Sequence, residues 1–253
     1  MHFTGNIYRP PLEANTPLLE ITYGCSWNQC YFCSMYRNTK FGTSPIEDIE
    51  SDLKELKKYS PEIERIFLVN GDALTLPYEK LTIISKLIHK YLPNIKTISC
   101  YASIRNIRTK TVEELKKLHE EGFDEFYIGL ETANDYALKL MNKGYTSEEE
   151  QECLLKLEQA DISYNAIVMF GITGRGCSKE HIIETTQLLN RYKPKVILSM
   201  STSVQKQTPL EKYRVEGIYE ELTEREMIEE ELLFLKEWKW RIIAYTSAVI
   251  HII

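Results

Sequence analysis

Residues 18–33 read Leu18-Leu19-Glu20-Ile21-Thr22-Tyr23-Gly24-Cys25-Ser26-Trp27-Asn28-Gln29-Cys30-Tyr31-Phe32-Cys33. The first six form a short, largely apolar run that predicts a strand. Three cysteines follow it directly with the spacing C-x4-C-x2-C. Three thiolates on one short loop can bind three irons of a cubane cluster and leave the fourth iron open. Four-cysteine zinc sites usually consist of two C-x2-C pairs, and this sequence has no second pair.

The same order of elements recurs along the chain: a short apolar run, a loop and an amphipathic helix. The runs are rich in Ile, Val, Phe and Tyr, and they predict six strands. These strands are Leu18–Tyr23, Arg65–Asn70, Lys96–Tyr101, Glu125–Leu130, Asn165–Phe170 and Lys195–Met200. No linker rich in Gly, Ser or Pro divides the chain, which favours a single domain over residues 1–253.

Capping signals predict where the helices begin and end. In Ser44-Pro45-Ile46-Glu47, the serine would cap a helix and the proline would occupy its first position. The same capping box recurs at Thr111/Glu114, Ser147/Glu150 and Thr223/Glu226. Two helices would end in a left-handed glycine, at Gly122 and Gly144. Further helices are expected near Tyr78–Tyr91, Asn134–Met141 and Lys179–Tyr192.

Alternation of strands with helices predicts a parallel α/β sheet with right-handed crossovers. Two architectures fit this pattern: an open doubly wound sheet, and a complete or partial barrel with its site at the carboxyl ends of the strands. A cysteine loop, and no Gly-x-Gly-x-x-Gly motif, follows the first strand. The sequence therefore favours the barrel.

Composition limits the function classes. The 253 residues carry 31 Lys and Arg against 37 Asp and Glu, a net charge of −6, so bulk charge does not favour nucleic acid. The longest apolar stretches, Tyr164–Ile172 and Ile242–Ile253, are too short to span a bilayer. The start, Met1–Gly5, does not resemble a secretory signal, so we expect a cytoplasmic protein without a membrane partner.

Six cysteines are present, and an even number invites a disulfide interpretation. A chain of this length can build a core without disulfides, and clustered cysteines in the cytoplasm are more often metal or redox ligands. We therefore interpret Cys25, Cys30 and Cys33 as metal ligands, with zinc or purely structural thiols as alternatives. The scattered cysteines are interpreted as small buried side chains: Cys100, Cys153 and Cys177.

With its first strand, its cysteine loop and the aromatic residue before the last cysteine, the sequence resembles the radical S-adenosylmethionine (SAM) superfamily. It is most similar to the branch of oxygen-independent coproporphyrinogen oxidases, methylthiotransferases and elongator-type enzymes. The resemblance covers about residues 18–238 and includes Ile128-Gly129-Leu130-Glu131. It implies a single radical SAM domain with a partial (β/α)6 TIM-like barrel. The usual spacing is C-x3-C-x2-C, so this chain has one extra residue between Cys25 and Cys30.

The resemblance also implies the chemistry. In this superfamily three cysteines bind a [4Fe–4S] cluster, and SAM chelates the open iron through its amino and carboxylate groups. An electron from the cluster breaks the S–C5′ bond, and the resulting 5′-deoxyadenosyl radical abstracts a hydrogen from the substrate. Cys25, Cys30 and Cys33 match the cluster ligands. A one-electron donor such as a flavodoxin or ferredoxin and a small-molecule or peptide substrate are the implied partners.

Residues near the first two strand ends match positions that contact SAM in the family. Phe32 matches the aromatic residue near the adenine, although it could equally be a core residue. The family often has Gly-Gly-Glu after the second strand, where its backbone meets the SAM amino group. This chain has Asn70-Gly71-Asp72-Ala73, so Gly71 matches and Asp72 could replace the acid. The alternative there is an ordinary turn.

Three later strand ends supply further candidates. Glu131 would lie near the ribose or methionyl part of SAM, or would orient the turn that follows it. Arg105 could pair with a carboxylate of the cofactor or substrate, or could be a solvated surface residue. Gly171 and Gly174 would allow the backbone to approach the adenine closely.

Two function classes remain open. One is a radical SAM enzyme of unidentified substrate; the other is a non-catalytic iron–sulfur or zinc-binding carrier or sensor. The apolar tail, residues 239–253, matches nothing in the family. It could be a last strand beside a six-stranded barrel, a dimer contact or a remnant.

Overall fold

The computed structural model describes residues 1–240 and 245–248, which form two compact units. The first unit comprises Met1–Asn28, Met35–Ile128 and Lys156–Tyr164. The second unit comprises Gln29–Ser34, Gly129–Leu155 and Asn165–Ile253. The cysteine loop therefore passes from the first unit to the second between Asn28 and Gln29. Because both units are discontinuous in sequence, the single-domain organisation stays a prediction.

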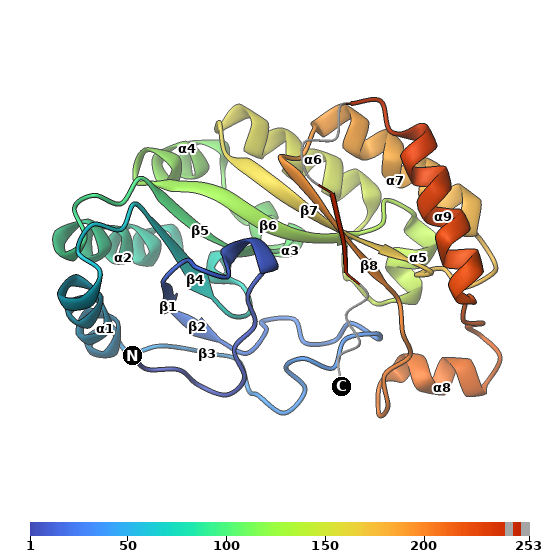
Figure 1. The fold of residues 1–253 in the computed structure, drawn as a ribbon, viewed down its shortest axis with the longest axis horizontal. Helices are drawn as coiled ribbons and strands as arrows, with labels where there is room; N and C mark the ends of the chain where they lie inside the picture. The colour runs from blue at the N-terminus through green and yellow to red at the C-terminus, as the bar shows by residue number, and fades with distance from the viewer. Residues whose placement is uncertain (241–244, 249–253) are drawn as a thin grey trace. The chain divides into compact units, whose positions relative to one another are not determined.

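The first unit contains strands that pair in parallel in the order β1, β4, β5 and β6 (Figure 1). Their bounds are β1 Leu18–Glu20, β4 Arg65–Val69, β5 Thr97–Ala102 and β6 Phe123–Glu131. A short antiparallel pair joins β2 (Thr22–Tyr23) to β3 (Gly42–Thr43). Helices α1 and α2 pack together, as do α2 and α4. The helical bounds are η1 Pro11–Glu13, α1 Ile46–Tyr59, η2 Ala73–Thr75, α2 Tyr78–Tyr91, α3 Ile104–Arg108 and α4 Val112–Glu120.

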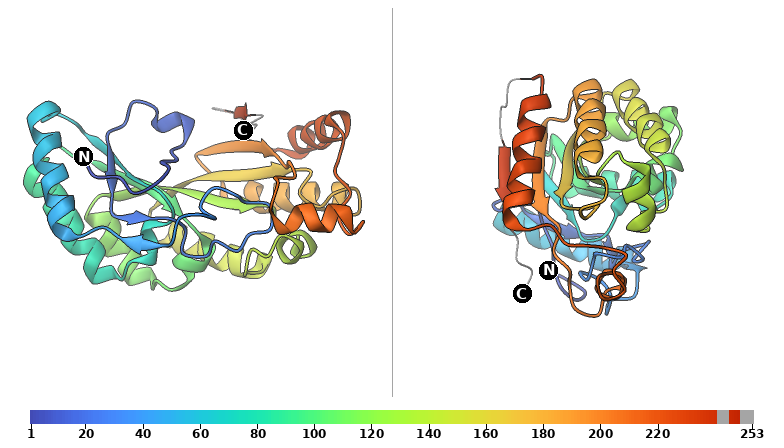
Figure 2. Two further views of the ribbon diagram at one scale, coloured as in Figure 1. Left: turned by 90° about the horizontal axis from the view of Figure 1, so that it is seen from below. Right: turned by 90° about the vertical axis from the view of Figure 1, so that its right-hand side faces the viewer.

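The second unit contains β7 (Ser163–Phe170), β8 (Val196–Ser201) and β9 (Tyr245–Ala248), which pair in parallel in that order. Helices α7 and α9 run side by side in it, as Figure 2 shows on the right. The helical bounds are α5 Asp135–Leu140, α6 Ser147–Gln159, α7 Ser178–Tyr192, α8 Pro209–Val215 and α9 Glu224–Glu237. Part of the predicted tail is therefore a last strand, whereas residues 241–244 and 249–253 lie outside the described residues.

All six predicted strands are confirmed, with one interruption. The run Leu18–Tyr23 divides at Ile21, so β1 pairs with β4 whereas β2 turns toward β3. The carbonyl of Ile21 accepts a hydrogen bond from the Ser44 amide at 3.1 Å, which fixes the change of direction. The cysteine loop thus leaves from β2 rather than from the parallel sheet.

Two of the four predicted capping boxes are confirmed, at Thr111/Glu114 and Thr223/Glu226. The prediction at Ser44 is wrong, because Pro45 is the N-cap residue and the Ser44 hydroxyl faces Glu20 at 3.4 Å. The prediction at Ser147 is wrong by one residue. The Thr146 amide donates to the Glu149 carboxylate at 2.9 Å, and the Glu149 amide donates to the Thr146 hydroxyl at 3.3 Å. Glu150, the predicted partner of Ser147, is buried instead.

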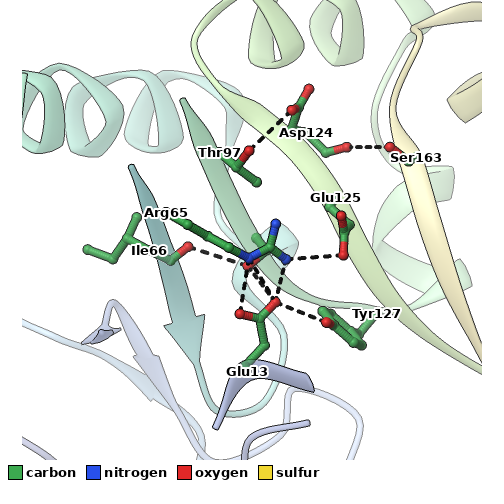
Figure 3. Close-up of polar contacts among 9 residues, drawn as sticks. Glu13, Arg65, Ile66, Thr97, Asp124, Glu125, Tyr127 and Ser163 are labelled. Carbon is green, nitrogen blue, oxygen red and sulfur yellow. Dashed lines mark hydrogen bonds and ion pairs between the residues drawn. The ribbon is translucent and has the colours of Figure 1, made fainter. Parts of the chain in front are cut away.

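A carboxylate from the N-terminal segment is fixed against three strands of the first unit (Figure 3). Glu13, at the end of η1, accepts hydrogen bonds from Arg65 Nε at 3.2 and 3.1 Å. It also accepts bonds from the Ser99 hydroxyl at 3.2 Å and the Tyr127 hydroxyl at 2.9 Å. Burial would raise the pKa of the Glu13 carboxyl, but the bonds from Arg65, Thr16 and Tyr127 outweigh it and lower the pKa.

Replacing Glu13 should therefore destabilise the protein in a pH-dependent way. Glu13→Gln should lower the free energy of unfolding by about 2 kcal/mol at pH 7, because charge-assisted bonds to Arg65 are lost. A carboxyl with a lowered pKa contributes above its unfolded pKa and loses that contribution as the pH falls through the folded value. Urea unfolding at pH 7 and pH 4 measures the difference, which should shrink at pH 4. Glu120→Gln, at an exposed position of α4, is the control; equal stability of Glu13→Gln and wild type at pH 7 would contradict the prediction.

Candidate cofactor site

The three clustered cysteines differ from two of the scattered ones in exposure. Cys25, Cys30 and Cys33 are partly exposed and form no disulfide, whereas Cys100 and Cys153 are buried. Burial of Cys100 and Cys153 confirms their interpretation as core side chains. The same interpretation is wrong for Cys177, which is partly exposed because it is the N-cap residue of α7. The accessible thiols are thus those of the loop, together with Cys177.

Gly71 lies against the start of the cysteine loop within the first unit. A Cβ atom on Gly71 would come within 1.8 Å of the Gly24 carbonyl oxygen, so no other residue fits there. The Gly71 amide donates to the Tyr36 hydroxyl at 3.2 Å. The Gly71 backbone therefore packs closely against the loop that carries Cys25, and its contact with the SAM amino group stays a prediction.

Asp72 points into the first unit and is only 3% exposed. Its carboxylate accepts a hydrogen bond from the Asn106 side chain, and its Oδ1 atom has no hydrogen-bond partner within the described residues. Burial raises the pKa of Asp72 to about 7, although Ser103, Asn106 and Lys110 act in the opposite direction. Asp72 is therefore a buried acid that changes charge near neutral pH.

This raised pKa predicts a pH dependence of stability. The folded protein holds the Asp72 proton more tightly than the unfolded chain, so stability should fall as the pH rises from about 4 to 7. Asp72→Asn, which mimics the protonated acid, should remove this decline and exceed wild type by on the order of 3 kcal/mol at pH 8. Urea unfolding at pH 5 and pH 8 tests this; parallel pH profiles of the two proteins would refute it.

Helix α3 contacts the first half of the cysteine loop through two side chains. Asn106 Nδ2 donates to the Ser26 hydroxyl at 3.3 Å and to the Thr75 hydroxyl at 2.7 Å. The Arg105 guanidinium lies over the Trp27 ring, 3.7 Å from its centroid. The structure therefore places Arg105 on the loop, and a carboxylate partner for it stays a prediction. Sequence reasoning missed Asn106, although Ser103 and Asn106 form a recognisable helix start.

The second half of the cysteine loop is fixed within the second unit. The Tyr31 amide donates to the Met141 carbonyl at 2.9 Å, and the Leu210 amide donates to the Tyr31 carbonyl at 3.1 Å. The Tyr31 ring meets Tyr213 edge-on, with centroids 5.3 Å apart. Phe32 is partly buried against an apolar cluster of this unit. Backbone bonds on both sides of Tyr31 thus fix the segment that carries Cys30 and Cys33.

Glu131 and Lys143 form a buried ion pair close to this segment. Lys143 Nζ lies 2.9 Å from Glu131 Oε1 and donates to the Gly129 carbonyl at 2.9 Å. Burial would lower the pKa of Lys143, but the charges of Glu131, Tyr145 and Cys30 outweigh it and raise the pKa well above its usual value. The ammonium also lies 5.9 Å from the Phe32 ring centroid. Lys143 is therefore a fixed positive charge near Cys30 and Phe32.

Glu131 has a backbone conformation that fits a functional position. Its φ angle is +67°, a left-handed value that costs a residue other than glycine about 1–3 kcal/mol. The turn after it is stabilised by other side chains: Thr132 accepts from the Asn134 amide at 3.0 Å, and Asn134 caps α5. The alternative role of Glu131, orienting this turn, is therefore filled by Thr132 and Asn134.

Gly171 and Gly174 follow β7, and both have left-handed φ angles, +76° and +61°. The Gly171 amide donates to Glu230 Oε2 at 2.6 Å, and its carbonyl accepts from the Tyr219 hydroxyl at 2.7 Å. A Cβ atom on Gly174 would lie 2.7 Å from the Glu220 carbonyl oxygen. The close approach predicted at Gly174 is thus made to the chain's own backbone, and contact with adenine stays a prediction for both glycines.

The cysteines fit an iron–sulfur cluster by residue type, spacing and exposure. Thiolates are the usual ligands of such clusters, and the three partly exposed cysteines share one loop. Among residues 1–240 and 245–248, no three His, Cys, Asp or Glu side chains are already gathered as a metal site. The three thiols therefore suit a cluster by their chemistry, although the described residues hold no preformed metal site.

Comparison with known proteins gives a family and a fold. The sequence model of the radical SAM superfamily matches residues 19–193. The heme chaperone HemW of Buchnera aphidicola subsp. Schizaphis graminum is 24% identical over 192 residues, which cover 72% of this chain and 49% of that protein. The chain thus spans about half the length of this curated relative.

Two solved structures illustrate the likeness in fold. The radical S-adenosylmethionine methyltransferase TsrM from Kitasatospora setae, with cobalamin and a [4Fe-4S] cluster bound, matches with a TM-score of 0.65 and 16% identity over 80% of this chain and 39% of that chain. The coproporphyrinogen III oxidase HemN of Escherichia coli, a radical SAM enzyme, matches with a TM-score of 0.62 and 14% identity over 88% of this chain and 53% of that chain. These matches confirm the predicted fold class, an α/β partial barrel of the radical SAM type.

Proposed function

The chain belongs to the radical SAM superfamily, and on that basis we propose that it is an enzyme that cleaves S-adenosylmethionine reductively and abstracts hydrogen from a substrate. The cofactors of the family, a [4Fe–4S] cluster and SAM, are the two that the resemblance implies. When bound, the cluster supplies the electron that breaks the S–C5′ bond of SAM. The observation that carries the proposal is the buried Lys143–Glu131 pair close to Cys30 and Phe32.

Lys143 and Glu131 suit the two charged ends of an amino acid. The methionyl part of SAM has an α-carboxylate and an α-amino group, and the Lys143 ammonium is a fixed partner for the carboxylate. Glu131 Oε1 contacts Lys143, which leaves the other carboxylate oxygen to accept from a ribose hydroxyl or an ammonium. Lys143 thus takes the role that sequence reasoning gave to Arg105, while Glu131 keeps its predicted role.

The other predicted positions keep their expected roles in this proposal. Cys25, Cys30 and Cys33 would bind the cluster as thiolates. Phe32, Gly171 and Gly174 would line the adenine. Near Gly71 and Asp72, a backbone carbonyl or the Asp72 carboxylate would accept from the amino group, while the Gly71 amide donates to Tyr36.

Anaerobic reconstitution tests the proposal without knowledge of the substrate. The full chain is loaded with iron and sulfide, reduced with dithionite and mixed with SAM, and 5′-deoxyadenosine is measured by chromatography. Release of 5′-deoxyadenosine that depends on Cys30 is the expected result. A cluster that forms without any cleavage would instead support the second candidate, a non-catalytic cluster-binding carrier. The HemW relative is named a heme chaperone, and this name favours a non-catalytic candidate.

The proposed partners are a small-molecule or peptide substrate and a one-electron donor such as a flavodoxin or ferredoxin. Within the described part of the chain, no helix has the length and apolar character needed to cross a membrane. A cytoplasmic location stays a prediction.

A further inference from the structure

Two buried side chains outside the predicted site form a polar contact within the second unit. His181 on α7 and Glu230 on α9 have side chains only 1% and 2% exposed. His181 Nε2 and Glu230 Oε1 lie 3.3 Å apart, which is ion-pair distance, and neither atom makes a hydrogen bond within the described residues. Taking a carboxylate out of water is costly unless it has partners, so a buried pair in this position needs an explanation.

Each member of the pair contacts the end of a different strand. On one side, His181 Nδ1 lies 3.3 Å from the Thr132 hydroxyl, directly after Glu131 at the end of β6. On the other side, Glu230 Oε2 accepts the Gly171 amide at 2.6 Å, directly after β7. The pair therefore connects the residues that follow two strands through side chains on two helices.

Both strand ends are fixed further by hydroxyl groups. Thr185 on α7 accepts from the Ala133 amide at 3.0 Å and donates to the His181 carbonyl at 2.6 Å. Tyr219 donates to the Gly171 carbonyl at 2.7 Å. The peptide groups on either side of Gly171 are thus both bonded to buried side chains. Glu131, next to one of these contacts, has a left-handed φ angle of +67°, which a residue other than glycine keeps only where the surroundings enforce it.

We propose that His181 and Glu230 are positioning residues, which hold the strand ends carrying Glu131 and Gly171 in the arrangement that binds SAM. This inference rests on the proposed function, because it assigns Glu131 and Gly171 to SAM. Neither His181 nor Glu230 touches the cofactor in this role. Glu230 acts through the Gly171 amide, and His181 acts through Thr132.

The test uses two variants of Glu230 in the reconstituted full chain. Glu230→Leu keeps the packing volume of α9 but removes the acceptor of the Gly171 amide, and should weaken SAM binding about tenfold in a calorimetric titration. Glu230→Gln retains an oxygen acceptor and should restore affinity to within about threefold of wild type. His181→Leu should weaken SAM binding to a similar extent, because it removes the side chain that links Glu230 to Thr132.

Thr186→Val is the matched control. Thr186 is buried on α7, and its hydroxyl donates to the Ile182 carbonyl at 2.6 Å, a hydrogen bond within the same helix. This variant should lower the melting temperature and leave SAM affinity unchanged. Loss of stability in Glu230→Leu with unchanged SAM affinity would overturn the proposal and leave a structural role only.

Hydrogen exchange on the protein without cofactors separates this inference from the proposed function. Glu230→Leu should accelerate amide exchange in the segment around Gly171 and also in residues 131–134, which Glu230 reaches through His181. Acceleration around Gly171 alone would overturn the connection. If wild type bound no SAM, the proposed function would fail, and the exchange measurement would still decide whether the two strand ends are coupled.

Discussion

Cys30→Ala should abolish the brown iron–sulfur chromophore of the anaerobically reconstituted protein. The Cys30 thiolate is a proposed cluster ligand, and loss of one of three such ligands would leave an iron without a protein bond. Cys30 is also the thiol whose charge contributes to the raised pKa of Lys143, so it lies close to the proposed SAM carboxylate partner. Iron content and the absorbance spectrum measure the result, and Cys25→Ala and Cys33→Ala should behave in the same way.

The buried cysteines are the controls for this prediction. Cys100→Ala and Cys153→Ala change core side chains and should retain the full iron content. Cys177→Ala, at a partly exposed position, should retain it as well. Retention of the full iron content by Cys30→Ala would refute the assignment, and zinc without iron in wild type would favour a zinc-binding protein.

Lys143→Met should weaken SAM binding by about a hundredfold or more while leaving the cluster in place. The substitution removes the proposed partner of the SAM carboxylate and leaves Glu131 as a buried charge without its ammonium. Charged hydrogen bonds are worth about 1.5–3 kcal/mol, and an unpaired buried charge adds to the loss. Calorimetric titration of the reconstituted variant with SAM gives the affinity, and iron content shows that the cluster remains.

Two further variants make the result for Lys143 interpretable. Lys143→Arg keeps a positive charge and should recover part of the affinity even if Lys143→Met folds poorly. Lys139→Met removes an exposed lysine of α5 and should change nothing. Unchanged SAM affinity in Lys143→Met would exclude Lys143 as the carboxylate partner and would return that role to Arg105.

Sequence patterns predicted the framework because each pattern has a local cause. Apolar runs of strand length identified all six strands, and two threonine capping boxes fixed the starts of α4 and α9. The pattern failed at Ser147, because Thr146/Glu149 and Ser147/Glu150 both match a capping box. Only the burial of Glu150 decides between the two. The burial of Glu150 depends on tertiary packing and cannot be predicted from the local sequence.

Candidate site residues could be proposed from the sequence where a distinctive residue lies at a strand end or within two residues of it. Cys25, Gly71 and Glu131 follow that rule. Lys143 does not, because its importance comes from burial beside Glu131, twelve residues earlier in the chain. His181 and Glu230 lie on helices and resemble ordinary polar residues until their contacts with Thr132 and Gly171 are known. Pairing of buried charges is a tertiary property, so spacing alone could not reveal it.

The Glu13 network has a consequence for folding during synthesis. Its bonds join Glu13 to residues 52, 86 and 114 positions later, at Arg65, Ser99 and Tyr127. Such long sequence separations raise the contact order and slow folding. Glu13 emerges from the ribosome well before Tyr127, and its carboxylate cannot complete its bonds until Tyr127 has emerged. A segment that is made earlier is therefore secured only after a later one has been made, and until then Glu13 remains hydrated.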